Sequence, residues 1–114
     1  MKLTDLEPKF VRYNTHDGIE YTNFEGITFN NAQGIWFLCP ICFMKNNGPV
    51  GTHSIDVTFK DRGALDNQGS HGTNGQPTRW TVTGSSFDDL TTQPSILLGG
   101  GCGWHGYITN GQVT

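Results

Sequence analysis

The chain of 114 residues has few charged and few large apolar side chains: 15% of its residues are charged and 34% are hydrophobic. Its seven basic residues are scattered along the chain, and ten acidic residues give a formal net charge of −3. Binding to a phosphate backbone depends on clustered Lys and Arg. We therefore do not expect this protein to bind nucleic acid.

Long apolar runs are also missing. The longest, residues 35–44, has about half the length that crosses a bilayer, and the first ten residues lack the apolar segment of a signal peptide. We expect no membrane association and an intracellular location. Thiols stay reduced there, and three cysteines cannot all pair within one chain, so a disulfide scaffold is not expected.

Glycine, in contrast, is abundant, with 16 residues. Many glycines and a thin core favour short strands joined by turns over long helices. The predicted strands are residues 9–13, 18–22, 34–38, 53–59, 79–83 and 94–98. The Asn110-Gly111 pair predicts a tight hairpin that sets Ile108 opposite Val113. We expect one mostly β domain over residues 1–114, built from small antiparallel sheets.

One long segment, residues 61–78, is polar and glycine-rich, and its apolar side chains are only Ala64 and Leu65. Such a segment cannot bury enough surface to offset the entropy lost on ordering. We predict a mobile surface loop, which in a small domain is also a candidate place for a partner to bind.

Two short motifs carry the three cysteines: Cys39-Pro-Ile-Cys42 and Cys102-Gly-Trp-His105. Three sulfurs and one imidazole nitrogen form a common tetrahedral set for a closed zinc site. We predict that Cys39, Cys42, Cys102 and His105 bind Zn²⁺ in a zinc-ribbon-like Cys3His site. Structural zinc contributes on the order of 10 kcal/mol to folding in small peptides, so chelation should unfold this thin-cored chain.

Two other interpretations of the cysteines stay open. A C-x-x-C pair also fits thioredoxin-type redox chemistry, which needs a helix beginning at the first cysteine. No βαβ pattern surrounds the pair, however, and residues 43–51 make a poor helix. The cysteines could also be buried and inert.

Two side chains near these motifs have more than one interpretation. His53 shares the apolar face of its predicted strand with Ile55 and Val57, so the simplest interpretation is a core histidine bonded to a backbone carbonyl. Alternatively it supports the metal ligands or replaces one of them. Trp104 lies inside the second motif and is a candidate contact surface if it faces solvent.

We assign no catalytic residue. Ser95, His53 and either Asp88 or Asp89 are the residue types of a catalytic triad. No nucleophile-elbow sequence surrounds Ser95, however. Pro94-Ser95 is more typical of the start of a strand, and the two aspartates are more typical of a capped turn.

Three stretches, IWFLCPICFMKNNGPVGTH, RWTVTGSSFDDLTTQPSIL and CGWHGYITNGQV, together resemble a group of small phage and prophage proteins catalogued only as a domain of unknown function. The resemblance covers residues 34–113. It implies a compact, mostly β zinc-binding fold in the cytoplasm of a host bacterium, and it lends no activity.

We therefore expect a non-enzymatic, zinc-stabilised phage protein that acts through contacts with a host or phage protein, such as a component of a defence system. One alternative is a zinc-dependent hydrolase or nuclease-like enzyme in which His53 lies near a metal with an open position. A second alternative is a zinc ribbon that binds nucleic acid, which would need a basic face assembled in three dimensions.

Overall fold

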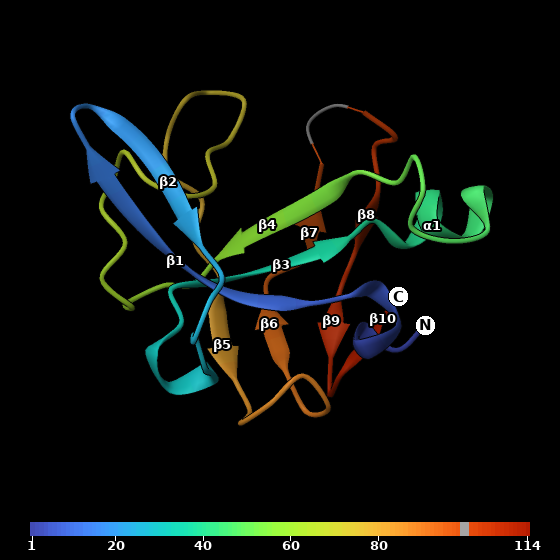
Figure 1. Cartoon of the computed structure of the whole chain (residues 1–114). Coiled ribbons are helices and arrows are strands. Elements are labelled where there is room, and N and C mark those ends of the chain that lie inside the picture. Colours follow the sequence, from blue (N-terminus) through green and yellow to red (C-terminus); the bar gives the residue numbers. More distant parts are fainter. Residues whose placement is uncertain (99–100) are drawn as a thin grey trace.

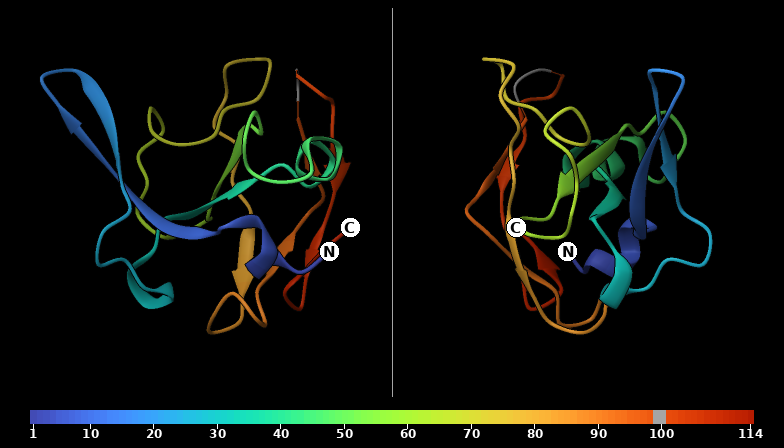
Figure 2. Two further views of the ribbon diagram at one scale, coloured as in Figure 1. Left: turned by 45° about the vertical axis from the view of Figure 1, so that its right-hand side comes forward. Right: turned by 90° about the vertical axis from the view of Figure 1, so that its left-hand side faces the viewer.

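The computed structural model describes residues 1–98 and 101–114, and its strands form two layers (Figures 1 and 2). The first layer is an antiparallel sheet with the strand order β2-β1-β3-β4. Its strands are β1 (Lys9–His16), β2 (Ile19–Asn23), β3 (Gly34–Leu38) and β4 (Ser54–Thr58). Strand β3 is central and almost wholly buried, as its continuous apolar sequence predicts.

The second layer consists of three two-stranded antiparallel sheets. They pair β5 (Thr81–Thr83) with β6 (Thr91–Gln93), β7 (Ile96–Leu97) with β8 (His105–Gly106), and β9 (Ile108–Thr109) with β10 (Gln112–Val113). The backbone N–H of Gly111 donates to Leu90 O at 2.9 Å and so joins the last hairpin to β6. The N–H of Val113 donates to Met1 O at 2.7 Å, which places the two chain ends side by side (Figure 1).

The hydrophobic core lies between the two layers and confirms the mostly β prediction. Phe10 of β1 stacks on Phe87 with ring centroids 4.3 Å apart, and Phe37 of β3 meets Trp104 edge to face at 6.1 Å. Both aromatic pairs join the first layer to the second. The fully buried side chains include Leu3, Leu6, Ile35, Val57, Phe59, Leu90, Ile96 and Ile108.

Three short helices complete the fold: η1 (Leu3–Leu6), η2 (Phe29–Asn31) and α1 (Pro40–Asn46). The expectation that no helix follows the first cysteine is wrong, because α1 begins directly after Cys39. Pro40 occupies the first helical position, where its missing N–H needs no partner. Asn47 ends the helix in the left-handed conformation with φ of 55°. These end signals are local and outweigh the poor helix propensity of the sequence that follows.

The segment 61–78 has many hydrogen bonds to the rest of the protein. The Arg79 guanidinium donates to the carbonyl oxygens of Leu65, Gln68 and Ser70 at 2.6–2.9 Å. The Ser70 hydroxyl donates to Asp56 O at 2.6 Å. Mobility of this segment stays a prediction, but its backbone is tied to β4 and to the start of β5.

Among the described residues, no helix is both long enough and apolar enough to cross a membrane.

Candidate functional site

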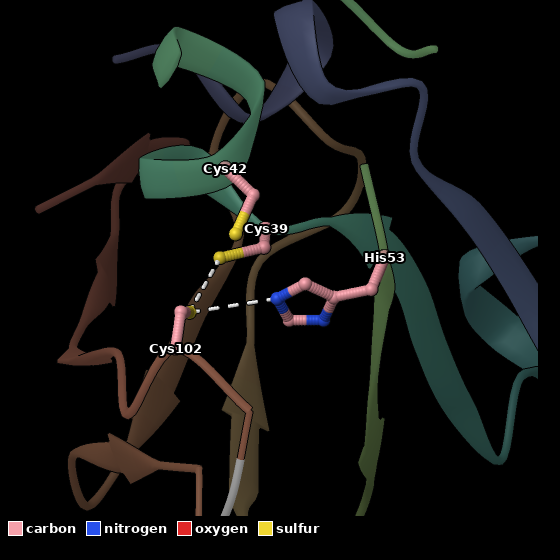
Figure 3. Close-up of side chains that lie close together, drawn as sticks. All are labelled: Cys39, Cys42, His53 and Cys102. Atoms are coloured by element: carbon pink, nitrogen blue, oxygen red, sulfur yellow. Dashed lines mark hydrogen bonds between the residues drawn. The ribbon is translucent and has the colours of Figure 1, made fainter. Parts of the chain in front are cut away.

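Three cysteines and one histidine meet at one end of the first layer (Figure 3). Cys39 lies between β3 and α1, Cys42 lies in the first turn of α1, and His53 directly precedes β4. Cys102 comes from the turn before β8, so two of the three segments belong to the first layer and one to the second. The Cys39 N–H donates to His53 O at 2.9 Å, which fixes two of the segments to each other.

The geometry of this cluster suits a metal ion. Its four ligand atoms all lie within 4.8 Å of one another. Cys102 Sγ is 3.4 Å from Cys39 Sγ and 3.5 Å from His53 Nε2. Two sulfurs bound at 2.3 Å to one tetrahedral ion lie roughly 3.8 Å apart, and the three cysteines are free of disulfides. The cluster could therefore hold a metal ion after only small side-chain adjustments.

The thiols of Cys39 and Cys102 differ in their electrostatics. Burial raises the pKa of Cys39 to about 11. The hydrogen bond with His53 lowers the pKa of the exposed Cys102 to about 7. Because thiolates are the metal-binding form, Cys102 offers a ligand at neutral pH, whereas burial favours the neutral thiol of Cys39 and a bound cation would have to stabilise its thiolate.

The imidazole of this cluster comes from His53 and not from His105. His53 is exposed, so the interpretation as a core histidine is wrong. His105 was predicted as the fourth ligand, but it lies outside the group that the described residues form. The reason is that residues 105–106 are extended as β8, so Trp104 and His105 point to opposite faces. Trp104 is 4% exposed, which makes it a core residue and not a contact surface.

His105 instead faces Ser95. The pairing of β7 with β8 sets Leu97 opposite His105 and Ile96 opposite Gly106. Ser95 therefore lies diagonally across from His105 on the exposed face, within reach of a long side chain. Ser95 Oγ and His105 Nε2 are 2.9 Å apart. If Nδ1 carries the imidazole proton, the hydroxyl donates to Nε2.

A pocket of about 290 Å³ opens beside this pair, and Ser95 is one of its walls. The other lining residues are His71, Gly72, Thr73, Thr78, Trp80 and Leu97. A reactive hydroxyl bonded to an imidazole at the edge of a pocket is an arrangement suited to nucleophilic catalysis.

The predicted role of Asp89 is clear in the structure. Asp89 accepts hydrogen bonds from the backbone N–H groups of Ser85 and Ser86 at 2.9 Å, which lower its pKa. Asp89 therefore caps a turn, as predicted. Ser95 contacts His105, and His53 contacts Cys102, so the triad of Ser95, His53 and an aspartate considered from sequence does not form.

The sequence contained a signal for the Ser95–His105 pair. Ser95 lies in the predicted strand 94–98, and a glycine-rich connection joins that strand to the segment that contains His105. Pairing those segments sets a serine near a histidine on one face. The C-x-x-H spacing instead indicated a metal-binding motif, so His105 was assigned to the cysteines and not to Ser95.

One comparison with known proteins identifies a related family. A family model described as "Bacterial ubiquitination-like system serine protease (BubE)" matches residues 13–114. No curated protein and no solved structure matches the chain.

This match corrects the expected function. The prediction of a non-enzymatic protein that acts through contacts is wrong, because the family is named for serine protease activity and so points to an enzyme. The alternative of a zinc hydrolase is also overturned, since a serine protease uses a serine hydroxyl as its nucleophile. The expected phage origin finds no support in the comparison.

Proposed function

This chain belongs to the BubE serine protease family, and we propose that Ser95 is its nucleophile and His105 its general base. The observation that carries the proposal is the 2.9 Å distance between Ser95 Oγ and His105 Nε2. This is the contact that a serine needs in order to lose its proton as it attacks. His105 is exposed and Ser95 is half-buried beside the pocket, so a peptide can reach both.

The chemistry is acyl transfer in two steps. Ser95 Oγ attacks the scissile carbonyl carbon while His105 Nε2 takes the hydroxyl proton. The tetrahedral intermediate collapses, the C–N bond breaks, and His105 gives that proton to the leaving amine. Water then attacks the acyl-enzyme ester, again with His105 as base, which releases the new carboxylate and restores the serine.

The substrate class follows from the family description. The family description assigns the protease to a bacterial ubiquitination-like system, and we propose a ubiquitin-like modifier or its conjugate as the substrate. This protein substrate takes the place of the host or phage partner expected from the sequence.

We further propose that Cys39, Cys42, His53 and Cys102 bind Zn²⁺. Three thiolates and one imidazole are a preferred zinc set, and four protein ligands leave no position for a reactive water. Such an ion would join α1, β4 and the turn before β8. Its role would be structural, and peptide hydrolysis would depend on Ser95 and His105.

Labelling with a fluorophosphonate, which reacts with activated serines, tests the assignment without a known substrate. We expect one label on Ser95, none in Ser95→Ala, and slow labelling in His105→Gln. Ser54→Ala, which changes an exposed serine outside the pair, should label as the parent protein does. Labelling that survives in Ser95→Ala would refute the proposed nucleophile.

A further inference from the structure

One wall of the pocket beside Ser95 is apolar and firmly held. The indole N–H of Trp80 donates to Ser95 O at 3.2 Å, and the Trp80 backbone N–H donates to Thr58 O at 2.9 Å. Leu97 follows Ser95 by two positions on the same face of β7 and is 63% exposed. An exposed leucine next to a reactive hydroxyl is free to contact a bound peptide.

The opposite wall is a turn within the segment 61–78. His71 and Pro77 are bridged as neighbouring strands would be, and the Gly72 N–H donates to Gln76 O at 2.9 Å. Gly72, Thr73 and Thr78 line the pocket on this side. Because Arg79 holds this segment through the carbonyls of Leu65, Gln68 and Ser70, the wall has a defined position.

The pocket offers a ligand no charged group with a hydrogen-bonding atom free. His71 is the one titratable side chain among its seven lining residues. Its Nδ1 lies 3.0 Å from Gly69 O and its Nε2 lies 2.7 Å from Asp66 O, so both ring nitrogens face the backbone of their own loop. A charged side chain entering the pocket would lose water without gaining a hydrogen bond from a group of opposite charge, which is costly.

We infer that this pocket binds an uncharged, mainly apolar side chain of the substrate residue that supplies the scissile carbonyl. The inference rests on the proposed function, because it takes Ser95 as the attacking group. The side chain on the acyl side begins two bonds from the attacked carbon, whereas the side chain on the leaving side begins three bonds away. A pocket that includes Ser95 as a wall therefore receives the acyl-side residue first.

A series of peptidyl diphenyl phosphonates tests this inference, because the active-site serine attacks their phosphorus, phenoxide leaves and the P–O bond to the serine is stable. The members of the series differ only in the acyl-side residue. We expect the Val, Leu and Phe members to inactivate the full-length protein roughly 10- to 100-fold faster than the Asp and Lys members. Fastest inactivation by Asp or Lys, or rates that agree within about twofold across the series, would overturn the inference.

A charge placed in the pocket should change this preference. Leu97→Lys should lower the rate of inactivation by the Leu phosphonate and raise the rate of inactivation by the Asp phosphonate. We expect the ratio of the two rates to change roughly tenfold. Leu65→Lys is the matched control, because Leu65 is 59% exposed and does not line the pocket. Equal behaviour of the two variants would show that Leu97 does not contact the acyl-side residue.

The two proposals fail in different ways. If fluorophosphonate labels Ser95 but the phosphonate series shows no preference, the pocket inference is wrong and the catalytic pair stands. If Ser95 is not labelled by either reagent, the catalytic pair itself is wrong.

Discussion

Only two residues of chain separate Cys102 of the cysteine cluster from His105 of the Ser95–His105 pair, yet different interactions hold the two sites. The cluster collects side chains from three distant segments, and burial disfavours the thiolate of Cys39 unless a cation is bound. The pair is formed by two neighbouring strands, β7 and β8, through ordinary sheet pairing. The comparison teaches that a histidine's role depends on which face of its strand it occupies, and not on its spacing from a cysteine.

Removing the metal ligands should have the largest effect. Structural zinc contributes on the order of 10 kcal/mol, whereas whole domains are stable by about 5 to 15 kcal/mol. We expect His53→Ala and Cys102→Ala to lose bound zinc and to unfold at room temperature, while His105→Ala keeps one zinc per chain. Metal content by mass spectrometry and circular dichroism measure both outcomes.

The opposite dependence of metal binding on the two histidines would contradict the assignment of His53 to the cysteine cluster. If His105→Ala lost the metal and His53→Ala kept it, His105 would be the ligand, as its spacing first predicted. The variant His53→Cys sharpens the test, because a fourth thiolate should preserve zinc binding and the fold.

Removing the proposed general base, His105, should have the next largest effect, and it should change only the catalytic rate. We expect His105→Ala to lower kcat by about 10² to 10⁴-fold, the usual contribution of general acid–base catalysis. Its zinc content and melting temperature should stay those of the parent protein. Tyr107→Ala, which changes an exposed side chain on the same face two positions later, serves as the control. A His105→Ala protein with full activity would exclude His105 as the base.

Asp56 should make stability depend on pH. Its burial raises its pKa from 3.8 to about 6 in the folded protein, so folding favours the protonated carboxyl. The resulting stabilisation is fully present below pH 3.8 and is lost as the pH rises through 6, by up to about 3 kcal/mol.

Asp56→Asn should remove this pH dependence, because an amide does not titrate in this range. The amide oxygen can still accept the hydrogen bond from the Tyr13 hydroxyl, which lies 2.7 Å from the carboxylate. Urea unfolding of both proteins between pH 4 and pH 7.5 compares the two slopes. If the free energy of unfolding depended on pH equally in both proteins, Asp56 would have an ordinary pKa in the folded protein.

Replacing Arg79 should have a modest effect on stability and a visible effect on selectivity. Arg79→Met removes hydrogen bonds to the carbonyls of Leu65, Gln68 and Ser70, and we expect a loss of about 2 kcal/mol. The pocket wall should loosen, so preference among the phosphonates should decline while fluorophosphonate labelling of Ser95 persists. Arg12→Met, which removes one hydrogen bond to Asn31 O on the other layer, should leave selectivity unchanged.

Much of the fold could be predicted because local patterns carry it. Apolar β3, alternating β4 and the Asn110-Gly111 hairpin lie where the sequence indicates, and Val113 pairs with Ile108. Strand β6 was missed because Thr91–Gln93 is polar, and its pairing with β5 depends on a partner and not on its own composition. Helix α1 was missed because its signals lie at its two ends.

The amino-acid sequence by itself determined the mostly β class and the three thiols as potential metal ligands, since strand periodicity and short motifs are local properties. Only the tertiary structure decided which histidine joins the thiols and which meets Ser95. That choice depends on strand pairing across the two layers, which sets the direction of each side chain and cannot be read from spacing along the chain.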